Sequence, residues 1–376
     1  MQSFKDDPGL STGAFKGALE GPLRTGVTTG LCAAAAAKAA TIALLASVPV
    51  PSVEVTTRDG AKHKFDVTDS VRENGYARCA VKKDAGDDPD VTNGIKIHAA
   101  VSKSETQGIE IEGGEGVGRV TKPGLKVAVG SAAINPVPME MIRAEIEQGC
   151  RQYGYAGGIK AVISIPGGAD IAKRTMNERL GIAGGLSILG TSGIVEPMSE
   201  RAIVETIKAE IDVWVASGSE SLVITPGNYG RDFAKAALAV DIEKAVKCSN
   251  FIGETLDYIC GKGITQVRLI GHAGKLVKLA GGVMNTHSSI ADCRMEIIAA
   301  HAALAGAGRE VIERIMQSVT TEAAIEVLSP LGINAQVWQS IGEKIGFHIK
   351  ERTKGKVLVT YTVFTQDHGV LTHGSA

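Results

Sequence analysis

Carboxylates in glycine-containing turns are the first residues of this chain that could carry chemistry. Asp90 ends a run of four aspartates within residues 84–90, and Glu115 stands in a later glycine-rich turn. Crowded carboxylates raise one another's pKa, which favours a general base. The same crowding suits a divalent cation, although the spacing is not that of an EF-hand loop. A solvated acidic turn explains the aspartates equally well.

Cations, imidazoles and hydroxyl groups also accompany the predicted loops. Thr28 and Thr29 precede an alanine-rich helix expected over residues 30–45, whose first N–H groups could bind an anion. A capped, tightly packed core helix is the alternative. The cationic and imidazole candidates are Arg24, Lys173, Arg174, His272, Lys275 and His287. Each of them could equally be a solvated or structural side chain.

Four short apolar runs end in glycine-containing loops, at residues 166–168, 190–193, 226–230 and 271–275. If their strands are parallel, the loops share one edge of a sheet, where α/β proteins bind ligands. Residues 113–124 are not a dinucleotide fingerprint, because Arg119 replaces the third glycine. Residues 271–275 are not a P-loop, because Leu269 and Leu276 replace required residues. Residues 113–124 could still form a glycine-rich flap.

The elements that must position these residues change in kind near residue 132. Residues 1–20 resemble a flexible tail. Strands at 53–57, 63–67, 76–82, 95–101 and 109–112 dominate the first region. Afterwards helices alternate with strands at 159–165, 186–189, 222–225, 267–270 and 357–364. We therefore predict the α/β class: a strand-rich α+β domain over 21–132 and an α/β domain with a mainly parallel sheet over 133–376.

Composition excludes several classes of protein. The 376 residues are 44% hydrophobic with a net charge of −1, so neither a basic nucleic-acid surface nor an acidic tail is indicated. The six cysteines form no CxxC pair, which fits reduced thiols and predicts no protein-bound metal. We find neither a signal peptide nor an apolar run of the roughly 18 residues that a membrane span needs. We expect a cytoplasmic protein.

Several motifs in order resemble the CbiD family of cobalt-precorrin-5B C(1)-methyltransferases. They lie at residues 24–30, 90–94, 113–124, 184–198, 227–230 and 271–288, and the match covers about residues 22–364. The resemblance implies transfer of a methyl group from S-adenosylmethionine to C-1 of cobalt-precorrin-5B, giving cobalt-precorrin-6A in anaerobic cobalamin biosynthesis. Cobalt would then arrive within the substrate. A non-catalytic corrinoid-binding protein, or a phosphotransferase using residues 113–118, remains the alternative.

The resemblance also gives the candidate residues their roles. Asp90 and Glu115 become the catalytic candidates. We place the cofactor against Gly190, Thr191, Gly193, Gly227, Asn228, Tyr229 and Gly230. The carboxylates of a tetrapyrrole need cationic and polar partners, for which Arg24, Thr28, Thr29, Lys173, Arg174, His272, Lys275 and His287 are candidates. We expect a small-molecule substrate, no nucleic acid and no membrane, and we allow for a homo-oligomer.

Overall fold

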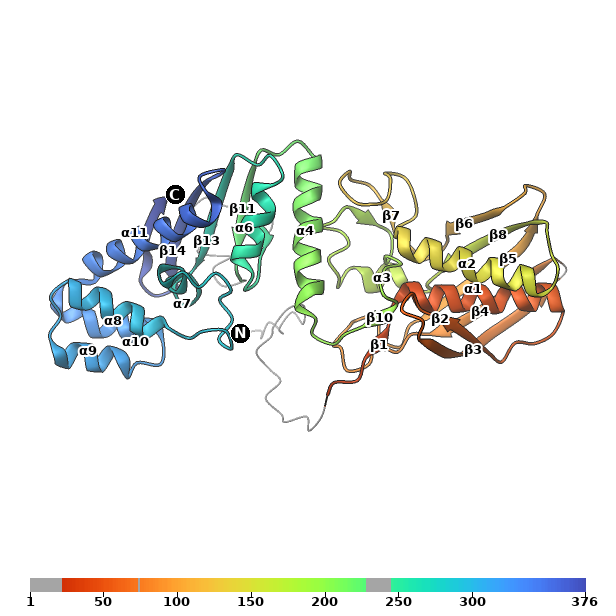
Figure 1. Cartoon of the computed structure of the whole chain (residues 1–376), viewed down its shortest axis with the longest axis horizontal. Coiled ribbons are helices and arrows are strands. Elements are labelled where there is room, and N and C mark those ends of the chain that lie inside the picture. The colour runs from red at the N-terminus through yellow and green to blue at the C-terminus, as the bar shows by residue number, and fades with distance from the viewer. Residues whose placement is uncertain (1–21, 74, 228–244) are drawn as a thin grey trace, which may run out of the picture. The chain divides into compact units, whose positions relative to one another are not determined.

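A computed structural model describes residues 22–73, 75–227 and 245–376 (Figure 1). The chain divides into two compact units, Met1–Ser199 and Glu200–Ala376. The change of element pattern near residue 132 does not coincide with this division. Residues 133–199, which we assigned to the second domain, belong to unit 1. Their strand at 158–164 joins the N-terminal sheet, and their helix at 136–152 packs against the first helix. The expected tail lies outside the described residues.

Unit 1 is built on a six-stranded sheet in the order β2-β3-β4-β5-β8-β6. Neighbouring strands are antiparallel except β6 and β8, which are parallel. Two helices, α1 and α2, pack together over this sheet (Figure 1). The elements are β1 Gly26–Val27, α1 Thr29–Ala46, β2 Ser52–Thr56, β3 Lys62–Glu73, β4 Tyr76–Lys82, β5 Lys96–Ser104, β6 Ile109–Gly113, β7 Arg119–Val120, α2 Pro136–Gln152, β8 Gly158–Ser164, α3 Gly168–Ala172, β9 Ile182–Ala183 and β10 Ile194–Val195.

Helix α1 is the core element of unit 1. Its alanines are buried on every side, because small side chains let the sheet and α2 approach its backbone closely. By length and composition alone α1 could also cross a membrane, contrary to our expectation that no apolar segment is long enough. In the structure 78% of this segment is buried, as in the core helix of a soluble fold.

Unit 2 contains a five-stranded sheet in the order β12-β11-β13-β14-β15. The first four strands are parallel, and β15 runs antiparallel to β14. Helices α4, α6 and α11 enclose one apolar core with the sheet. The elements are α4 Glu200–Ala216, β11 Ser221–Thr225, β12 Val246–Lys247, α6 Ile252–Cys260, β13 Gln266–His272, α7 Ala273–Leu276, η2 Val277–Gly281, α8 Arg294–Leu304, α9 Arg309–Met316, α10 Thr321–Leu328, η3 Ser329–Leu331, α11 Asn334–Thr353, β14 Leu358–Thr365 and β15 Gly369–Ser375.

The α/β class is confirmed, but two predicted strands have other roles. The strand expected at 159–165 is β8, and it completes the sheet of unit 1 rather than joining β11 and β13. Residues 186–189 form no strand; they make isolated bridges to Val117 and Ile134. The four glycine-containing loops therefore do not share one sheet edge. The two loops that follow β11 and β13 do share one, because these strands are parallel neighbours.

Candidate functional site

In unit 1 the predicted threonines surround the first turn of α1. The Oγ1 of Thr28 accepts from the Leu31 N–H at 3.2 Å, so Thr28, rather than Thr29, is the N-cap. Thr29 Oγ1 donates to Leu189 O at 3.2 Å and accepts from Leu189 N at 2.9 Å. The Gly30 N–H donates to Leu189 O at 3.0 Å. Protein groups thus accept from the Gly30 and Leu31 N–H groups, and the structure favours the capped core helix over an anion site.

Gly190, Thr191 and Gly193 lie in the loop that closes over this turn. The Gly193 carbonyl accepts from the Thr28 N–H at 2.9 Å. A Cβ on Gly190 would lie 2.4 Å from Thr28 Oγ1, and the φ of Gly190 is +134°. The loop therefore packs tightly against α1, which explains its glycines without a ligand.

The four aspartates of the acidic loop each accept from a different donor group. Asp84 pairs with the Arg24 guanidinium at 2.5 Å, and Asp87 accepts from the Arg24 N–H at 2.6 Å. Asp88 accepts from the Met198 N–H at 2.9 Å. Asp90 pairs with Lys83 at 2.7 Å. The carboxylates thus fasten neighbouring segments, and within the described residues no group of three or more acidic, histidine or cysteine side chains could hold a metal ion.

Asp84 and Asp90 do not have the raised pKa values that we expected from crowding. The hydrogen bond from Arg24 lowers the pKa of Asp84 to about 2. Burial alone would raise the pKa of Asp90, but the hydrogen bond and charge of Lys83, helped by Thr92, outweigh burial and lower it. The cause is that both carboxylates accept hydrogen bonds from cationic side chains, Asp84 from Arg24 and Asp90 from Lys83. The expected poised base is therefore not found at Asp90.

The glycine-rich turn after β6 is packed rather than a flap. The N–H groups of Gly114, Val117 and Gly118 all donate to protein carbonyls. A Cβ on Gly116 would lie 1.9 Å from Ile165 O, so this glycine permits close packing of two loops. These three amides are not available to a phosphate, which argues against the phosphotransferase alternative. Glu115 lies on its exposed side.

Two further cationic candidates of unit 1 lie on the surface after α3. Lys173 pairs with Asp170 at 2.7 Å across one turn, and both side chains are exposed. Arg174 is exposed as well. Arg24, Lys173 and Arg174 are thus accessible to an anionic ligand, but the first two already hold a carboxylate of the protein.

Unit 2 offers a different kind of site, at the carboxyl ends of its parallel strands. After β11 the chain continues to β12 on one side, whereas after β13 it continues to β14 on the other. The connections thus leave β11 and β13 in opposite directions. In open α/β sheets the crevice outside such a switch point is where ligands bind. Gly227 follows β11 here, His272 is the last residue of β13, and Lys275 follows β13.

Lys275 bridges the switch point. Its Nζ donates to Pro226 O at 2.7 Å, across from β13 to the loop after β11. The side chain is half-buried, and burial lowers its pKa, although the nearby Cys248 thiol counteracts this shift. Pro226 O is the single hydrogen-bond partner of this ammonium among the described residues. Two of its three N–H donors remain for a ligand.

His272 is already engaged by the protein. Its Nδ1 accepts from the Gly274 N–H at 3.2 Å, and its Nε2 lies 2.9 Å from Glu322 Oε1 on α10. This network places the proton of the neutral ring on Nε2, directed at the carboxylate. The edge of the ring also contacts Phe364. His272 therefore fixes the loop after β13 to α10, and substrate contact through its nitrogens would require breaking these bonds.

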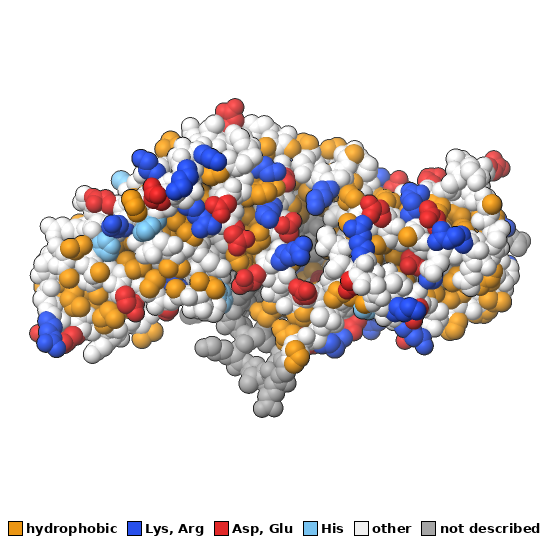
Figure 2. Space-filling view, viewed as in Figure 1, with side chains coloured by type: hydrophobic (Ala, Val, Ile, Leu, Met, Phe, Trp, Pro, Cys, Tyr) orange, Lys and Arg blue, Asp and Glu red, His pale blue; other side chains and the backbone are white. Residues whose placement is uncertain are grey.

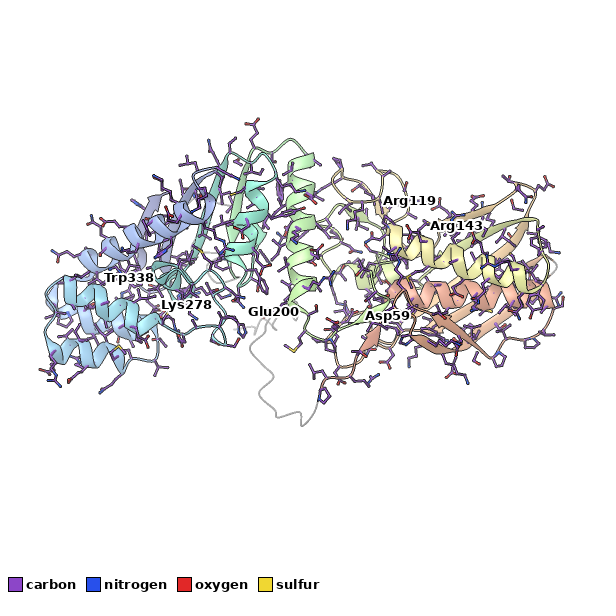
Figure 3. All side chains as sticks on the ribbon, in the orientation of Figure 1. Asp59, Arg119, Arg143, Glu200, Lys278 and Trp338 are labelled. Carbon is purple, nitrogen blue, oxygen red and sulfur yellow. The ribbon has the colours of Figure 1, made fainter. Side chains whose placement is uncertain are left out.

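A buried lysine that we did not predict organises the adjacent loop. Lys278, labelled in Figure 3, has a side chain that is only 4% exposed. Its Nζ donates to Thr286 O at 3.1 Å and Ala291 O at 2.8 Å. The Thr286 N–H in turn donates to Asn250 O at 2.9 Å, just beyond β12. Residues 282–292 are thereby held beside the carboxyl edge of the sheet.

His287 lies in that loop and bonds locally, with Nδ1 2.6 Å from Ser289 Oγ. Lys278 could not be recognised from sequence, because a single lysine in an apolar run usually lies on the surface. Gly227, His272 and Lys275 are brought together at one edge, whereas Gly190–Gly193 lie in unit 1. Asn228, Tyr229 and Gly230, the other predicted cofactor contacts, lie outside the described residues.

Comparison with known proteins agrees with the division of the chain into two units at residue 199. Residues 17–197 match the family described as CbiD, and residues 285–375 match the CbiD C-terminal domain. A protein from Ruminiclostridium cellulolyticum named cobalt-precorrin-5B C(1)-methyltransferase is 53% identical over 86% of this chain and 84% of its own length. One of the same name from Alkaliphilus metalliredigens is 44% identical over 88% and 87%. A crystal structure described as cobalamin biosynthesis protein (cbiD) from Archaeoglobus fulgidus is 33% identical, covers 69% of this chain and 80% of that one, and has a TM-score of 0.38.

Proposed function

Because this chain belongs to the CbiD family, we propose that it is a cobalt-precorrin-5B C(1)-methyltransferase of cobalamin biosynthesis. The substrate is a small cobalt-containing tetrapyrrole, and the product is cobalt-precorrin-6A. The methyl donor is S-adenosylmethionine, and the activity belongs to the cytoplasm. The six cysteines, all free in the structure, support a reducing compartment.

The reaction needs alignment more than it needs an activated side chain. A π-electron pair of the macrocycle forms the new bond from C-1 to the methyl carbon, while the methyl–sulfur bond breaks and its electrons stay on sulfur. Because the macrocycle supplies the nucleophile, no serine or cysteine need be activated. Orienting two bound reactants can lower a barrier by roughly 7–11 kcal/mol in well-aligned cases. The task of the chain is to hold both reactants.

The switch point of unit 2 is the observation that supports a cofactor site there. It combines two strand-end loops with close backbone approach, since a Cβ on Gly271 would lie 2.9 Å from both Pro226 and Leu276. A nucleoside with an amino-acid tail suits such a crevice. The residues present fit this group, because Lys275 offers two donors to a carboxylate and is the one Lys, Arg, Asp or Glu in the sequence of residues 226–230 and 271–275.

For the tetrapyrrole carboxylates we propose the exposed cations of unit 1, above all Arg174, which pairs with no described carboxylate. Glu115 is the better of the two catalytic candidates, because it is exposed. The side chain of Asp90 accepts hydrogen bonds from Lys83 and Thr92, both in its own loop region. Its role in this proposal is to hold the loop in shape.

Activity is tested with labelled S-adenosylmethionine and cobalt-precorrin-5B, followed by mass analysis. One added methyl group on the tetrapyrrole is expected. Binding of the tetrapyrrole without methyl transfer would instead support the corrinoid-binding alternative and contradict the proposal.

The cofactor site is tested separately by titrating S-adenosylhomocysteine into Lys275→Met. Losing one charge-assisted hydrogen bond costs about 1.5–3 kcal/mol, so we expect affinity to fall by about 10- to 150-fold. Lys356→Met is the matched control, because Lys356 is an exposed lysine before the amino end of β14, at the opposite edge of the sheet. Equal affinities in both variants would remove Lys275 from the cofactor site and leave the activity assay unaffected.

A further inference from the structure

The outer edge of β15 and the flank of α11 form an open groove of about 650 Å³ in unit 2. It lies away from the carboxyl edge described above, along the last strand of the sheet. The groove is lined by Gln339, Glu343, Gly346, Phe347 and Lys350 of α11, and by Tyr361, Thr372, His373, Gly374, Ser375 and Ala376.

Strand β15 leaves a row of backbone groups unpaired on this side. Ala376 and Val359 exchange both of their backbone hydrogen bonds, at 2.8 and 3.0 Å. Because such pairs alternate along an antiparallel ladder, residues 372, 374 and 376 direct their N–H and C=O groups toward β14. His373 and Ser375 therefore direct theirs outward. No other described strand pairs with that edge.

The strand also lacks the features that usually block edge pairing. Its sequence, residues 369–375, contains no lysine, acidic residue or proline. On the adjoining helix, Phe347 is a large apolar side chain that is 54% exposed. An uncharged edge beside an exposed aromatic side chain favours association with another polypeptide.

The charges beside the groove are self-complementary. Glu343, Phe347 and Lys350 all line it from one side of α11. Phe347 lies between the acid and the base along the helix. When two copies of such a helix lie antiparallel, each Glu343 faces the Lys350 of the other copy, and the two Phe347 rings meet between these pairs. Neither Glu343 nor Lys350 has an ion-pair partner among the described residues.

One two-fold axis can serve both the pairing of β15 and the pairing of α11. The midpoint of residues 372–376 is Gly374, and the midpoint of 343 and 350 falls between Gly346 and Phe347. Tyr361 joins these two places: a Cβ on Gly346 would lie 3.4 Å from its ring, and one on Gly374 would lie 2.3 Å from its hydroxyl. A two-fold axis through this point pairs His373 with the partner's Ser375. Both residues direct their N–H and C=O groups outward, so they can form a hydrogen-bonded pair between the two edge strands.

We propose that this groove is the interface of a homodimer, occupied by β15 and α11 of a second copy. The axis runs perpendicular to the sheet, which joins the two five-stranded sheets into one of ten strands. The two α11 helices then lie antiparallel on the same face, with two Glu343–Lys350 pairs flanking Phe347. The same patch serves both subunits, as a two-fold interface requires.

Oligomeric mass and charge reversal test this interface on the full chain. We expect light scattering to give twice the chain mass of 39.0 kDa for the unaltered protein. Glu343→Lys and Lys350→Glu each place like charges opposite one another and should shift the mass to that of the monomer. The double variant exchanges the charges and should restore the dimer. Restoration also shows that the single variants were not simply misfolded.

Two controls sharpen the result. Glu310→Lys makes the same charge change at an exposed position of α9 and should remain dimeric. Phe347→Cys should form a disulfide-linked dimer under mild oxidation, since the residue lies beside the axis. A monomer at all soluble concentrations overturns the proposal. The proposal is also overturned if both single charge-reversal variants remain dimeric, or if the double variant stays monomeric.

Discussion

The buried ion pair between Lys83 and Asp90 makes unit 1 sensitive to one side chain. The ammonium belongs to a side chain that is 2% exposed, and Asp90 is 26% exposed. Asp90→Asn leaves this lysine charged and buried without its counter-ion. Breaking a fully buried pair costs 3–5 kcal/mol, and the partial exposure of Asp90 argues for the lower end, about 3 kcal/mol. For a unit of this size that corresponds to roughly 6–12 °C in Tm.

The loss also has a pH signature. The pKa of Asp90 is lower in the folded protein than in the unfolded chain, so the folded state binds fewer protons. The stabilisation is therefore complete above the unfolded pKa of about 3.9 and disappears as the pH falls through the lower, folded value. Asp90→Asn should remove this contribution at neutral pH and flatten the acid limb of the stability curve.

Two optical probes separate this effect from general destabilisation. Both tryptophans, Trp214 and Trp338, lie in unit 2, so their fluorescence follows that unit alone. Far-ultraviolet circular dichroism follows both units. We expect Asp90→Asn to lower the transition seen by dichroism and leave the fluorescence transition in place.

The exposed pair between Arg24 and Asp84 supplies the matched control for this experiment. Water screens that pair, so Asp84→Asn should cost much less than Asp90→Asn. Equal losses in the two variants would refute the argument from burial. A fall in turnover with unchanged stability in Asp90→Asn would refute the structural role that we give Asp90 and restore it as a catalytic candidate.

Three further outcomes are expected. Thr28→Ala should lower the stability of unit 1 by about 1 kcal/mol in urea unfolding, because it removes a helix cap, whereas Thr28→Ser should retain most of it. Burial raises the pKa values of Cys32 and Cys248 to about 12, so iodoacetamide at pH 8 should leave both thiols unmodified in the native protein, as peptide mass mapping would show. Glu322→Ala should lower the tryptophan-monitored Tm of unit 2 by releasing His272, and Glu322→Gln, which still accepts a hydrogen bond, should lower it less.

Periodic and locally capped elements could be predicted from the sequence. Helix α1 followed from the alanine run, and β2 and β3 correspond to the strands predicted at 53–57 and 63–67. These elements are specified by residues close together in the chain. The division of the chain at residue 199 was not predicted, because a strand such as β8 carries no mark of the sheet that it joins.

The errors at the candidate site have the same origin. Residues 186–189 are apolar enough for a strand, but their backbone bonds go to Gly116 and Ala133 in two separate loops. The pKa shifts of the aspartates depend on Arg24 and Lys83, whose positions follow from tertiary packing. Strand β15 was missed because its seven residues do not alternate between apolar and polar: Val370 and Leu371 are adjacent, and glycines stand near both ends. The sequence therefore indicates which loops carry the candidate residues. It does not indicate which other segments those loops contact.

The bonds at the start of α1 have a consequence for synthesis. Thr29 and Leu189 are separated by 160 residues, yet their hydrogen bonds close the first turn of the core helix. During translation α1 leaves the ribosome long before its partner loop exists. Contacts so distant in sequence slow folding, because a long loop must close before they form. A nascent chain that stops before residue 187 would present an apolar alanine helix with no completed core around it, and such chains should be substrates for chaperones.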